Sequence, residues 1–553
     1  MARRKKHVCN KLIRKRVKYF FITCVLLFTY LTYRIFNITI LKNEEYESKI
    51  ESQSIETVNL NSGRGIIYDR NNVPLTDSKK TKVLLVPKKV VSGNFSNISL
   101  IKDATKLTEE DIYKAVQSQL SSEIIEIEID YIDNSKIEAL EEKGILVKEK
   151  TMRYSDDNLL THLIGYVKKS ENSGVSGIEK YMDDELKDSN KNYVSVFKAG
   201  QNKGGLTYLK GSVENISQNE DSKHLKLTID SKIQNNIEQI MDKEENPSAV
   251  VISDIQTGEI ISMCSRPNFN PNDISSYSNS SKGELQNRVL SVTYPPGSVF
   301  KLVVLFAALD NNIIDENYIY NCTGSTKVGS GGEVLNCNNL TVHGRETLEE
   351  AVANSCNTAF YDIAKRVGSE KIFDAIKILH LDEKVDIGIE EEKNSKIPKD
   401  IALSNLAIGQ DKIEFTPLQI NQMTQIIANN GTYKPLYVYD SIINNNKDIL
   451  KTYKSNKKEE IISPYTMTQI KRLMTSVSLI GTAKTLSDLE GGCGVKTGTA
   501  QSSLNGKPIS HGWITGFYPR ENPKYAITVV VEGTEESSKS AVPIFKDICQ
   551  KLK

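Results

Sequence analysis

The chain has 553 residues, of which 39% are hydrophobic and 25% are charged, and its formal net charge is +1. At roughly 150 residues per domain this length predicts several folded units. The composition is that of a globular protein, which excludes a disordered, collagen-like or many-pass membrane chain. The charge is unevenly placed: residues 1–18 hold nine lysines and arginines and no acidic residue, which leaves the rest of the chain net acidic.

The basic tail, residues 1–18, runs directly into an apolar segment, residues 19–41, in which Arg34 carries the only charge. A helix of this length can cross a bilayer core of about 30 Å. Because basic residues precede the segment and acidic ones follow it, the positive-inside rule predicts a cytoplasmic N-terminus and an external remainder. A cleaved signal peptide is the alternative, but its apolar core is shorter. We therefore expect a single-pass membrane anchor and no nucleic-acid partner for the tail.

The polar region after the anchor, residues 42–224, mixes strand-like runs such as residues 81–91 with helical stretches such as residues 107–120. Lysine, asparagine, serine and glycine gather over residues 185–223, which indicates a boundary. We expect an elongated α+β module over residues 42–224 and a second domain over residues 225–553.

The second domain is predicted to build one sheet from its two ends. Residues 248–265 form two apolar runs about a Thr257-Gly258 turn, which indicates a hairpin, and strand-like runs also begin at residues 496, 511 and 525. The chain between these β regions is mostly helical, and a closing helix follows residue 541. The fold class is α/β, with an antiparallel sheet flanked by helices.

A serine and a lysine share the start of an apolar helix: Ser298 is followed three residues later by Lys301. Side chains at i and i+3 lie on one helix face, so the hydroxyl and the amine can meet. A lysine kept neutral by burial is a competent base for a serine nucleophile, and the amides of a helix start can stabilise an oxyanion. Alone, this S-x-x-K pattern is common by chance and most often lies on a solvated helix face.

Two further motifs follow in order, Ser355-Cys356-Asn357 between predicted helices and Lys496-Thr497-Gly498-Thr499 on a predicted strand. Together, S-x-x-K, S-x-N and K-T-G are the signature of penicillin-binding proteins and class A β-lactamases. The three motifs therefore predict a serine acyl-transfer site.

Over nearly the whole external part, from residue 64 to about residue 533, the sequence resembles class B penicillin-binding proteins, the monofunctional high-molecular-weight members of that family. Outside the catalytic motifs, the resemblance rests on Arg64–Asn71, His162–Val167, Gly177–Tyr181, Asn287-Arg288, Gly409-Gln410, Thr416–Gln419, Gly481–Ala483 and His511–Trp513. It implies a transpeptidase domain with the serine β-lactamase-like fold, preceded by a non-catalytic pedestal, or dimerisation-type, module.

The resemblance implies a peptidoglycan D,D-transpeptidase that cross-links stem peptides. Ser298 would attack the carbonyl carbon of the penultimate D-Ala of the donor, with Lys301 as the general base. Ser355 would relay a proton to the departing D-Ala, and Asn357 would hold the donor peptide.

The K-T-G strand would bind the donor's terminal carboxylate through Lys496, Thr497 and Thr499, with Gly498 between them. The resemblance also implies that β-lactam antibiotics mimic the donor and remain on Ser298 as an acyl-enzyme. No cofactor is required for this chemistry.

Family members of this class work with a membrane-embedded glycan polymerase of the SEDS family, which the resemblance implies as a partner. A passive spacer is the alternative role for the module that precedes the transpeptidase domain. Cell shape, cell division and sporulation remain open as the process served.

Three cysteines and one histidine form the pattern C-x14-C-x5-H-x12-C through Cys322, Cys337, His343 and Cys356. Cysteine and histidine are the ligands of tetrahedral zinc, so the pattern suggests a structural zinc site behind the S-x-N loop. A Cys322–Cys337 disulfide and free thiols are the two alternatives.

Other functions with the same motifs stay open at this point. One is a β-lactamase or a β-lactam sensor. A class A β-lactamase needs a deacylating glutamate after S-x-N, and residues 390–394 offer E-x-x-x-N in a highly charged run typical of a surface loop. A D,D-carboxypeptidase would use water as the acceptor. A scaffold of a cell-wall synthesis complex would retain its role without Ser298.

Overall fold

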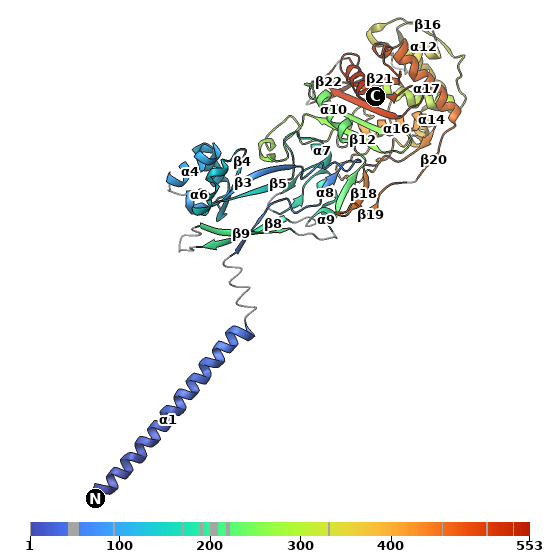
Figure 1. Ribbon diagram of the computed structural model, residues 1–553. Coiled ribbons are helices and arrows are strands. Elements are labelled where there is room, and N and C mark those ends of the chain that lie inside the picture. Colours follow the sequence, from blue (N-terminus) through green and yellow to red (C-terminus); the bar gives the residue numbers. More distant parts are fainter. Residues whose placement is uncertain are drawn as a thin grey trace. The chain divides into compact units, whose positions relative to one another are not determined.

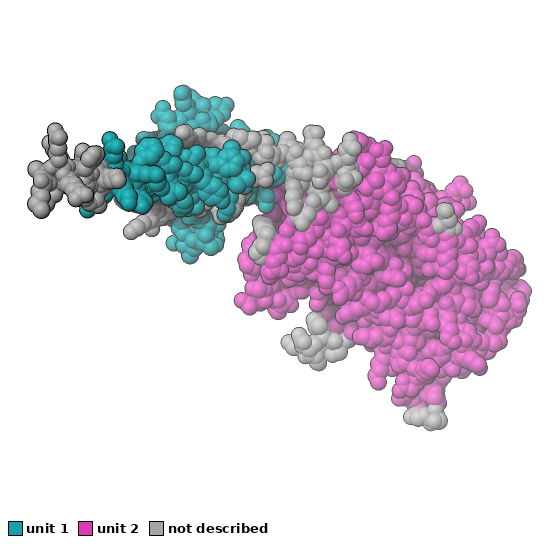
Figure 2. Space-filling view, turned by 90° about the horizontal axis from the view of Figure 1, so that it is seen from below, with its two compact units in different colours: residues 1–60, 81–150, 192–216 teal, residues 61–80, 151–191, 217–553 magenta. Residues whose placement is uncertain are grey.

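The computed structural model shows the chain as two compact units, each built from separated stretches of sequence (Figure 1; Figure 2). The first unit comprises residues 1–60, 81–150 and 192–216, and the second comprises residues 61–80, 151–191 and 217–553. The structure describes residues 2–42, 55–91, 95–168, 171–187, 192–199, 208–216, 222–329, 332–455, 457–504, 507–534 and 536–552.

The chain begins with a long helix, α1 (Ala2–Phe36), which continues as a short π-helix over Asn37–Leu41. Over Arg14–Leu41 it is long and apolar enough to cross a membrane, and it is the one such helix among the described residues. Its apolar side chains are exposed, as expected for a helix whose environment is lipid.

The rest of the first unit holds two sheets, ordered β4-β3-β5 and β1-β8-β9. In the α5 helix the Thr108 hydroxyl accepts the Asp111 amide in a capping box, which fixes the helix start. The elements are β1 (Ile55–Asn59), β3 (Lys79–Pro87), α3 (Lys88–Val91), α4 (Phe95–Thr105), α5 (Glu109–Ser118), β4 (Ile124–Ile129), α6 (Ile137–Glu142), β5 (Leu146–Met152), β8 (Asn192–Ala199) and β9 (Tyr208–Ile216).

The second unit is centred on an antiparallel sheet in the order β12-β11-β23-β22-β21. Its strands come from the two ends of the domain, as the sequence predicts: β11 (Ser248–Asp254), β12 (Ile260–Arg266), β21 (Gly494–Leu504), β22 (Lys507–Tyr518) and β23 (Tyr525–Glu532). The closing helix is α18 (Ala541–Lys551).

Helices cover both faces of this sheet. Helix α10 (Ser231–Met241) reaches one face, where Glu238 contacts Cys264, and α18 packs beside it. On the other face Asn421, from α16 (Pro417–Ala428), donates to Thr528 Oγ1 at 3.3 Å. The apolar helix α11 (Lys301–Asp310) is buried along nearly its whole length. The α/β fold class is confirmed.

Smaller elements complete the second unit, including a sheet ordered β19-β18-β10-β2. They are β2 (Ile67–Tyr68), α7 (Thr161–Ile164), β6 (Val167–Lys168), β7 (Ser173–Gly174), α8 (Gly177–Tyr181), α9 (Asp183–Leu186), β10 (His224–Leu227), β13 (Ile319–Cys322), β14 (Ser325–Val328), β15 (Glu333–Asn336), β16 (Gly344–Thr347), α12 (Leu348–Ala353), α13 (Asn357–Val367), α14 (Ser369–Ile378), α15 (Leu403–Ile408), β17 (Thr432–Tyr433), β18 (Tyr439–Ile443), β19 (Ile449–Thr452), β20 (Glu459–Glu460) and α17 (Pro464–Leu479).

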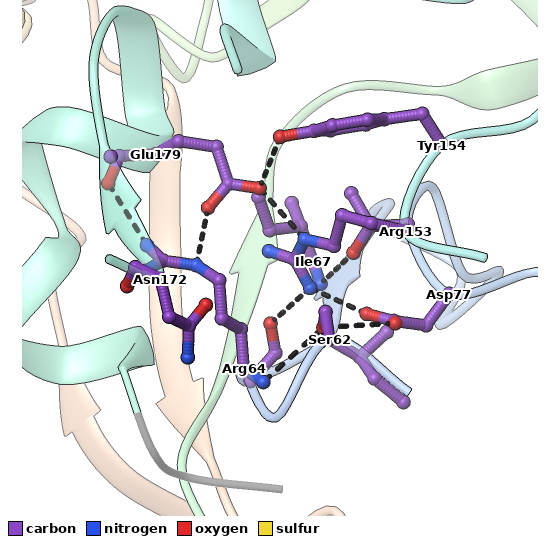
Figure 3. Close-up of polar contacts among 12 residues, drawn as sticks. Ser62, Arg64, Ile67, Asp77, Arg153, Tyr154, Asn172 and Glu179 are labelled. Atoms are coloured by element: carbon purple, nitrogen blue, oxygen red, sulfur yellow. Dashed lines mark hydrogen bonds and ion pairs between the residues drawn. The ribbon is translucent and has the colours of Figure 1, made fainter. Parts of the chain in front are cut away.

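A buried ionic network joins the early segments of this unit (Figure 3). Glu179 lies between two arginines: Oε2 is 2.9 Å from Arg64 Nε, and Oε1 is 2.7 Å from Arg153 Nε. Arg64 also pairs with Asp183 at 2.7 Å, and Arg153 pairs with Asp77. Each buried cation therefore faces carboxylates, which offset the cost of removing charge from water.

Candidate active site

The predicted nucleophile, Ser298, lies in a tight 3₁₀ turn, Gly297–Phe300, immediately before α11. Gly297 has a φ of 53°, and a Cβ there would lie 2.6 Å from the carbonyl oxygen of Thr499. Only glycine fits this left-handed position against the strand. The turn thereby brings Ser298 beside β21, the strand that carries K-T-G.

The Lys301 amine is bound by the S-x-N motif. It donates to the Ser355 carbonyl at 2.7 Å, to Asn357 Oδ1 at 2.7 Å and to Ser355 Oγ at 3.1 Å. These three oxygens use all three donors of an ammonium group. Within the described residues Ser298 Oγ makes no hydrogen bond, so the expected meeting of serine and lysine is not made in this resting geometry.

A second lysine converges on the same hydroxyl. Lys496 donates to Ser355 Oγ at 3.0 Å and to the Thr497 carbonyl at 3.0 Å, and like Lys301 it is fully buried. Burial lowers the pKa of Lys301 to about 8. Burial, followed by the nearby charge of Lys301, lowers the pKa of Lys496. Ser355 Oγ thus accepts hydrogen bonds from two buried lysines, each of which has a lowered pKa.

The S-x-N loop is held between α12 and α13 in an unusual conformation, because Ser355 has a φ of 56°. Such a left-handed serine is strained, and strain of this kind gathers at functional sites. On its other side the Asn357 amide donates to the Asn336 carbonyl at 2.8 Å, so the loop also contacts β15.

The K-T-G strand approaches the Ser298 turn closely at its glycine. A Cβ at Gly498 would lie 2.8 Å from the Pro296 carbonyl oxygen. The Thr497 hydroxyl is 2.6 Å from the hydroxyl of Thr482. The structure thus gathers the residues predicted for catalysis and donor binding around one turn, one loop and one strand.

The three cysteines and the histidine predicted as zinc ligands also come together. Cys337 Sγ is 3.6 Å from Cys322 Sγ and 3.7 Å from Cys356 Sγ, and His343 Nδ1 is 3.4 Å from Cys322 Sγ. The three cysteines are buried, and no disulfide joins them. The hydrogen bond between the two thiols lowers the pKa of Cys337 and raises the pKa of Cys356. A lowered thiol pKa favours the thiolate, which is the form that binds metal.

The acidic run considered for a β-lactamase has other partners. Glu390 pairs with Lys180, and Glu391 Oε1 accepts the Gly177 amide at 3.0 Å. Glu392 accepts backbone amides of its own loop at 3.0 and 3.1 Å. These contacts are structural, and they join this loop to α8.

Three residues at the site have contacts that sequence reasoning did not assign. Glu346 is buried, accepts from Asn354 at 2.9 Å and lies 3.8 Å from His343 Nδ1. Gln410 contacts the K-T-G strand and Thr482 contacts Thr497. Gln410 and Thr482 lie in two segments that carry the family resemblance, Gly409-Gln410 and Gly481–Ala483. The resemblance therefore identified their positions, but it did not predict these contacts.

The fold and the site define a transpeptidase domain of the serine acyl-transferase kind. The sequence model described as "Penicillin binding protein transpeptidase domain" matches residues 248–550, and that described as "Penicillin-binding Protein dimerisation domain" matches residues 59–214. The chain belongs to the penicillin-binding protein family, in its class B division. Transpeptidase domains of this family form a serine acyl-enzyme, are inhibited by β-lactams and need no cofactor for catalysis.

Curated relatives cover nearly the whole chain. Stage V sporulation protein D of Bacillus subtilis is 30% identical over 548 residues, which is 95% of this chain and 82% of the relative. Peptidoglycan D,D-transpeptidase FtsI of Escherichia coli is 24% identical over 545 residues, which is 92% of this chain and 86% of the relative.

Solved structures share the fold. The complex of Penicillin-Binding Protein PBP2 with MreC from Helicobacter pylori has a TM-score of 0.65 at 24% identity, covering 90% of this chain and 98% of that chain. A structure titled as a peptidoglycan synthase complex that coordinates polymerization and crosslinking has a TM-score of 0.68 at 20% identity, covering 97% and 98%.

Proposed function

We propose that the chain is a peptidoglycan D,D-transpeptidase that cross-links stem peptides through an acyl-enzyme on Ser298. The observation that carries this proposal is the convergence of two buried lysines, Lys301 and Lys496, on Ser355 Oγ beside the turn that holds Ser298. A hydroxyl that contacts both cations is suited to move a proton between them.

In the acylation step Ser298 Oγ attacks the carbonyl carbon of the penultimate D-Ala while its proton passes to neutral Lys301. The peptide bond to the terminal D-Ala then breaks, and the departing amine takes a proton through Ser355. An amine of a second stem peptide then attacks the ester carbonyl and forms the new peptide bond. The bond from that carbonyl carbon to Ser298 Oγ breaks, and a proton of the attacking amine passes through Lys301 to Ser298 Oγ. In a β-lactam the leaving nitrogen stays tethered to the acyl group, so the adduct persists.

Binding of the donor follows from the charges that line the strand. Lys496 supplies the cation for the terminal carboxylate, and the hydroxyls of Thr497 and Thr499 supply donors. Backbone amides of Ser298 and Thr499 stabilise the oxyanion, because the turn and the strand lie side by side there. The Asn357 side chain holds the donor's peptide group.

The test offers the detergent-solubilised full chain a stem-peptide donor that ends in D-Ala-D-Ala, together with an amine acceptor, and follows the products by mass spectrometry. We expect release of D-Ala with formation of the cross-linked product, and neither with Ser298→Ala. Hydrolysed donor alone would indicate a carboxypeptidase, and rapid turnover of penicillin would indicate a β-lactamase. Biological function retained by Ser298→Ala would indicate a scaffold.

We further propose a division into a cytoplasmic tail (residues 1–18), an anchor (19–41), a pedestal module (42–224) and an external transpeptidase domain (225–553). Charge on either side of the anchor supports this orientation. A SEDS-family polymerase is the proposed membrane partner; the solved synthase complex with this fold, which coordinates polymerization and crosslinking, supports a polymerase partner, and the SEDS family follows from the class B resemblance. Exchange of residues 1–41 for an unrelated anchor should keep penicillin acylation and abolish copurification with the polymerase.

We also propose that Cys322, Cys337, His343 and Cys356 hold a structural Zn²⁺. Ligand atoms about 2.3 Å from a tetrahedral metal lie about 3.8 Å apart, whereas a disulfide needs about 2.05 Å. The sulfur–sulfur distances of 3.6 and 3.7 Å fit the metal and not the disulfide. His343 turns Nδ1 toward this cluster, 3.4 Å from Cys322 Sγ, so Nδ1 would be the ligand atom of the histidine.

Because Cys356 is the middle residue of S-x-N, such a metal would brace the loop that carries Ser355 and Asn357. Metal analysis of the purified full chain should find one zinc per chain. We expect Cys322→Ser to lose it and Cys549→Ala, at a buried cysteine on α18, to keep it. Zinc retained by Cys322→Ser would contradict the assignment.

A further inference from the structure

The K-T-G strand, β21, stands last in the order of its sheet and pairs with β22 on one side. In a strand the amide and carbonyl of one residue point to the same side, and successive residues alternate. The Thr499 carbonyl and the Gln501 amide point away from β22, as shown by their hydrogen bonds to a side chain that lies outside the sheet. They form the edge along which another extended chain can pair.

That edge is covered by the side chain of Gln410. Its Nε2 donates to the Thr499 carbonyl at 3.2 Å, and its Oε1 accepts the Gln501 amide at 3.2 Å. A carboxamide has the same donor and acceptor as a peptide group. Gln410 therefore imitates one peptide group of an added strand.

The backbone around Gln410 explains this placement. Helix α15 ends at Ile408 and is capped by Gly409, which has a φ of 66°, and the Gln410 amide donates back to the Asn405 carbonyl at 3.0 Å. The Gly409 carbonyl accepts the Gly297 amide at 2.9 Å. A Cβ at Gly409 would lie 2.4 Å from the Gly297 carbonyl oxygen, so no larger residue fits. Gln410 is thus fixed next to the turn that carries Ser298.

An acyl donor needs the same edge. If its reacting carbonyl accepts the Thr499 amide, antiparallel pairing makes the amide of that same donor residue donate to the Thr499 carbonyl. The donor residue two positions earlier then faces the Gln501 amide. These are the two groups that Gln410 occupies, so the donor backbone and the Gln410 carboxamide compete for one place.

We propose that Gln410 is a specificity-determining residue that covers the donor's edge of β21 and is displaced by a ligand with an amide beside its reacting carbonyl. This inference rests on the proposed function and assigns the place of the donor backbone in that same site. Ligands that lack the amide leave Gln410 in position. The residue therefore discriminates between acyl donors by the amide that they carry.

The test measures second-order acylation rates of the full chain with benzylpenicillin, which carries an acylamino group beside its lactam carbonyl, and with imipenem, which carries a hydroxyethyl group there. Gln410→Ala frees both edge groups, and Gln410→Glu removes the donor to Thr499. Each should raise the benzylpenicillin rate about three- to tenfold, the worth of one or two hydrogen bonds, and leave the imipenem rate unchanged. The control is Asp411→Asn, at the exposed neighbouring residue, which should alter neither rate.

The inference would be overturned if Gln410→Ala left the ratio of the benzylpenicillin rate to the imipenem rate unchanged, including the case in which both rates fell together. Gln410 would then only stabilise the strand. Such a result would leave the proposed function intact, because Ser298 would still be acylated. No adduct with either drug on the unaltered chain would count against the proposed function itself.

Discussion

Two buried groups of charge in the second unit differ in how they are compensated. Arg64 and Arg153 share Glu179 (Figure 3), and each contacts one further carboxylate, Asp183 and Asp77 respectively. Around Ser355, Lys301 and Lys496 are equally buried, but within the described residues their hydrogen bonds go to neutral oxygens and neither forms an ion pair with a carboxylate. Carboxylates offset the charge of the two arginines, whereas burial favours the loss of a proton from Lys301.

The pKa directions follow this difference. Burial opposes the charge of Arg153, but Glu179 and Asp77 outweigh it and hold its pKa above the ordinary value. For Lys301 burial prevails and lowers the pKa to about 8. A buried arginine that is paired with carboxylates is therefore costly to leave without its partner, while an unpaired buried lysine at the same depth provides a base near neutral pH.

The largest effect on the acylation rate is expected when the amine of Lys301, which has no carboxylate partner, is removed. Lys301→Met should lower the rate of acylation by β-lactams about 10²- to 10⁴-fold, because a general base contributes that much. Stopped-flow or quenched mass spectrometry measures this rate. Lys365→Met, at a half-exposed lysine on α13, is the matched control and should change it little. Equal rates in the two variants would remove Lys301 from the reaction.

The compensated group is tested by its effect on stability. Glu179→Gln leaves two buried guanidinium groups without their shared carboxylate and should reduce the free energy of unfolding by about 3–5 kcal/mol. Chemical denaturation measures the loss. Glu390→Gln, in the exposed pair with Lys180, should cost less than about 1 kcal/mol. If both substitutions cost the same, the network does not stabilise the unit.

The pH profile sharpens the comparison further. Since the pKa of Lys301 is about 8 and its neutral form is the base, the fraction able to accept a proton grows as pH rises. The acylation rate should increase about tenfold per pH unit below this value and level off above it. A rate that does not change across pH 8 would show that another group takes the proton.

The smallest effect is expected at a hydroxyl that orients the carboxylate site. Thr482→Val keeps the shape of the side chain but removes the partner of Thr497 Oγ1, at 2.6 Å. It should lower the acylation rate about five- to tenfold, the worth of one hydrogen bond. Thr485→Val, at an exposed threonine nearby, should leave the rate unchanged. A loss in both variants would reflect the local fold.

Local patterns predicted much of this fold. The alternation about Thr257-Gly258 gave the β11–β12 hairpin, and the runs from residues 496, 511 and 525 became β21, β22 and β23. Each motif also lies on the kind of element that the sequence suggested: a helix start, a loop between helices and a strand. Such predictions succeed because neighbouring residues determine them.

Long-range contacts could not be predicted in the same way. Arg64, Arg153 and Glu179 come from three distant segments, and their ion pairs depend on packing that no local pattern encodes. The position of Gln410 on the edge of β21 is of the same kind. The spacing of Ser298 and Lys301 allowed their side chains to meet, but the oxygens of Ser355 and Asn357 bind the amine instead.

The most direct test of acyl transfer at Ser298 is the intact mass of the full chain after exposure to benzylpenicillin, measured over hours beside Ser298→Ala. We predict one adduct with the mass of the opened drug, persistent on the unaltered chain and absent from the variant. An adduct that survives in Ser298→Ala, or none on the unaltered chain, would contradict the assignment of this serine as the nucleophile.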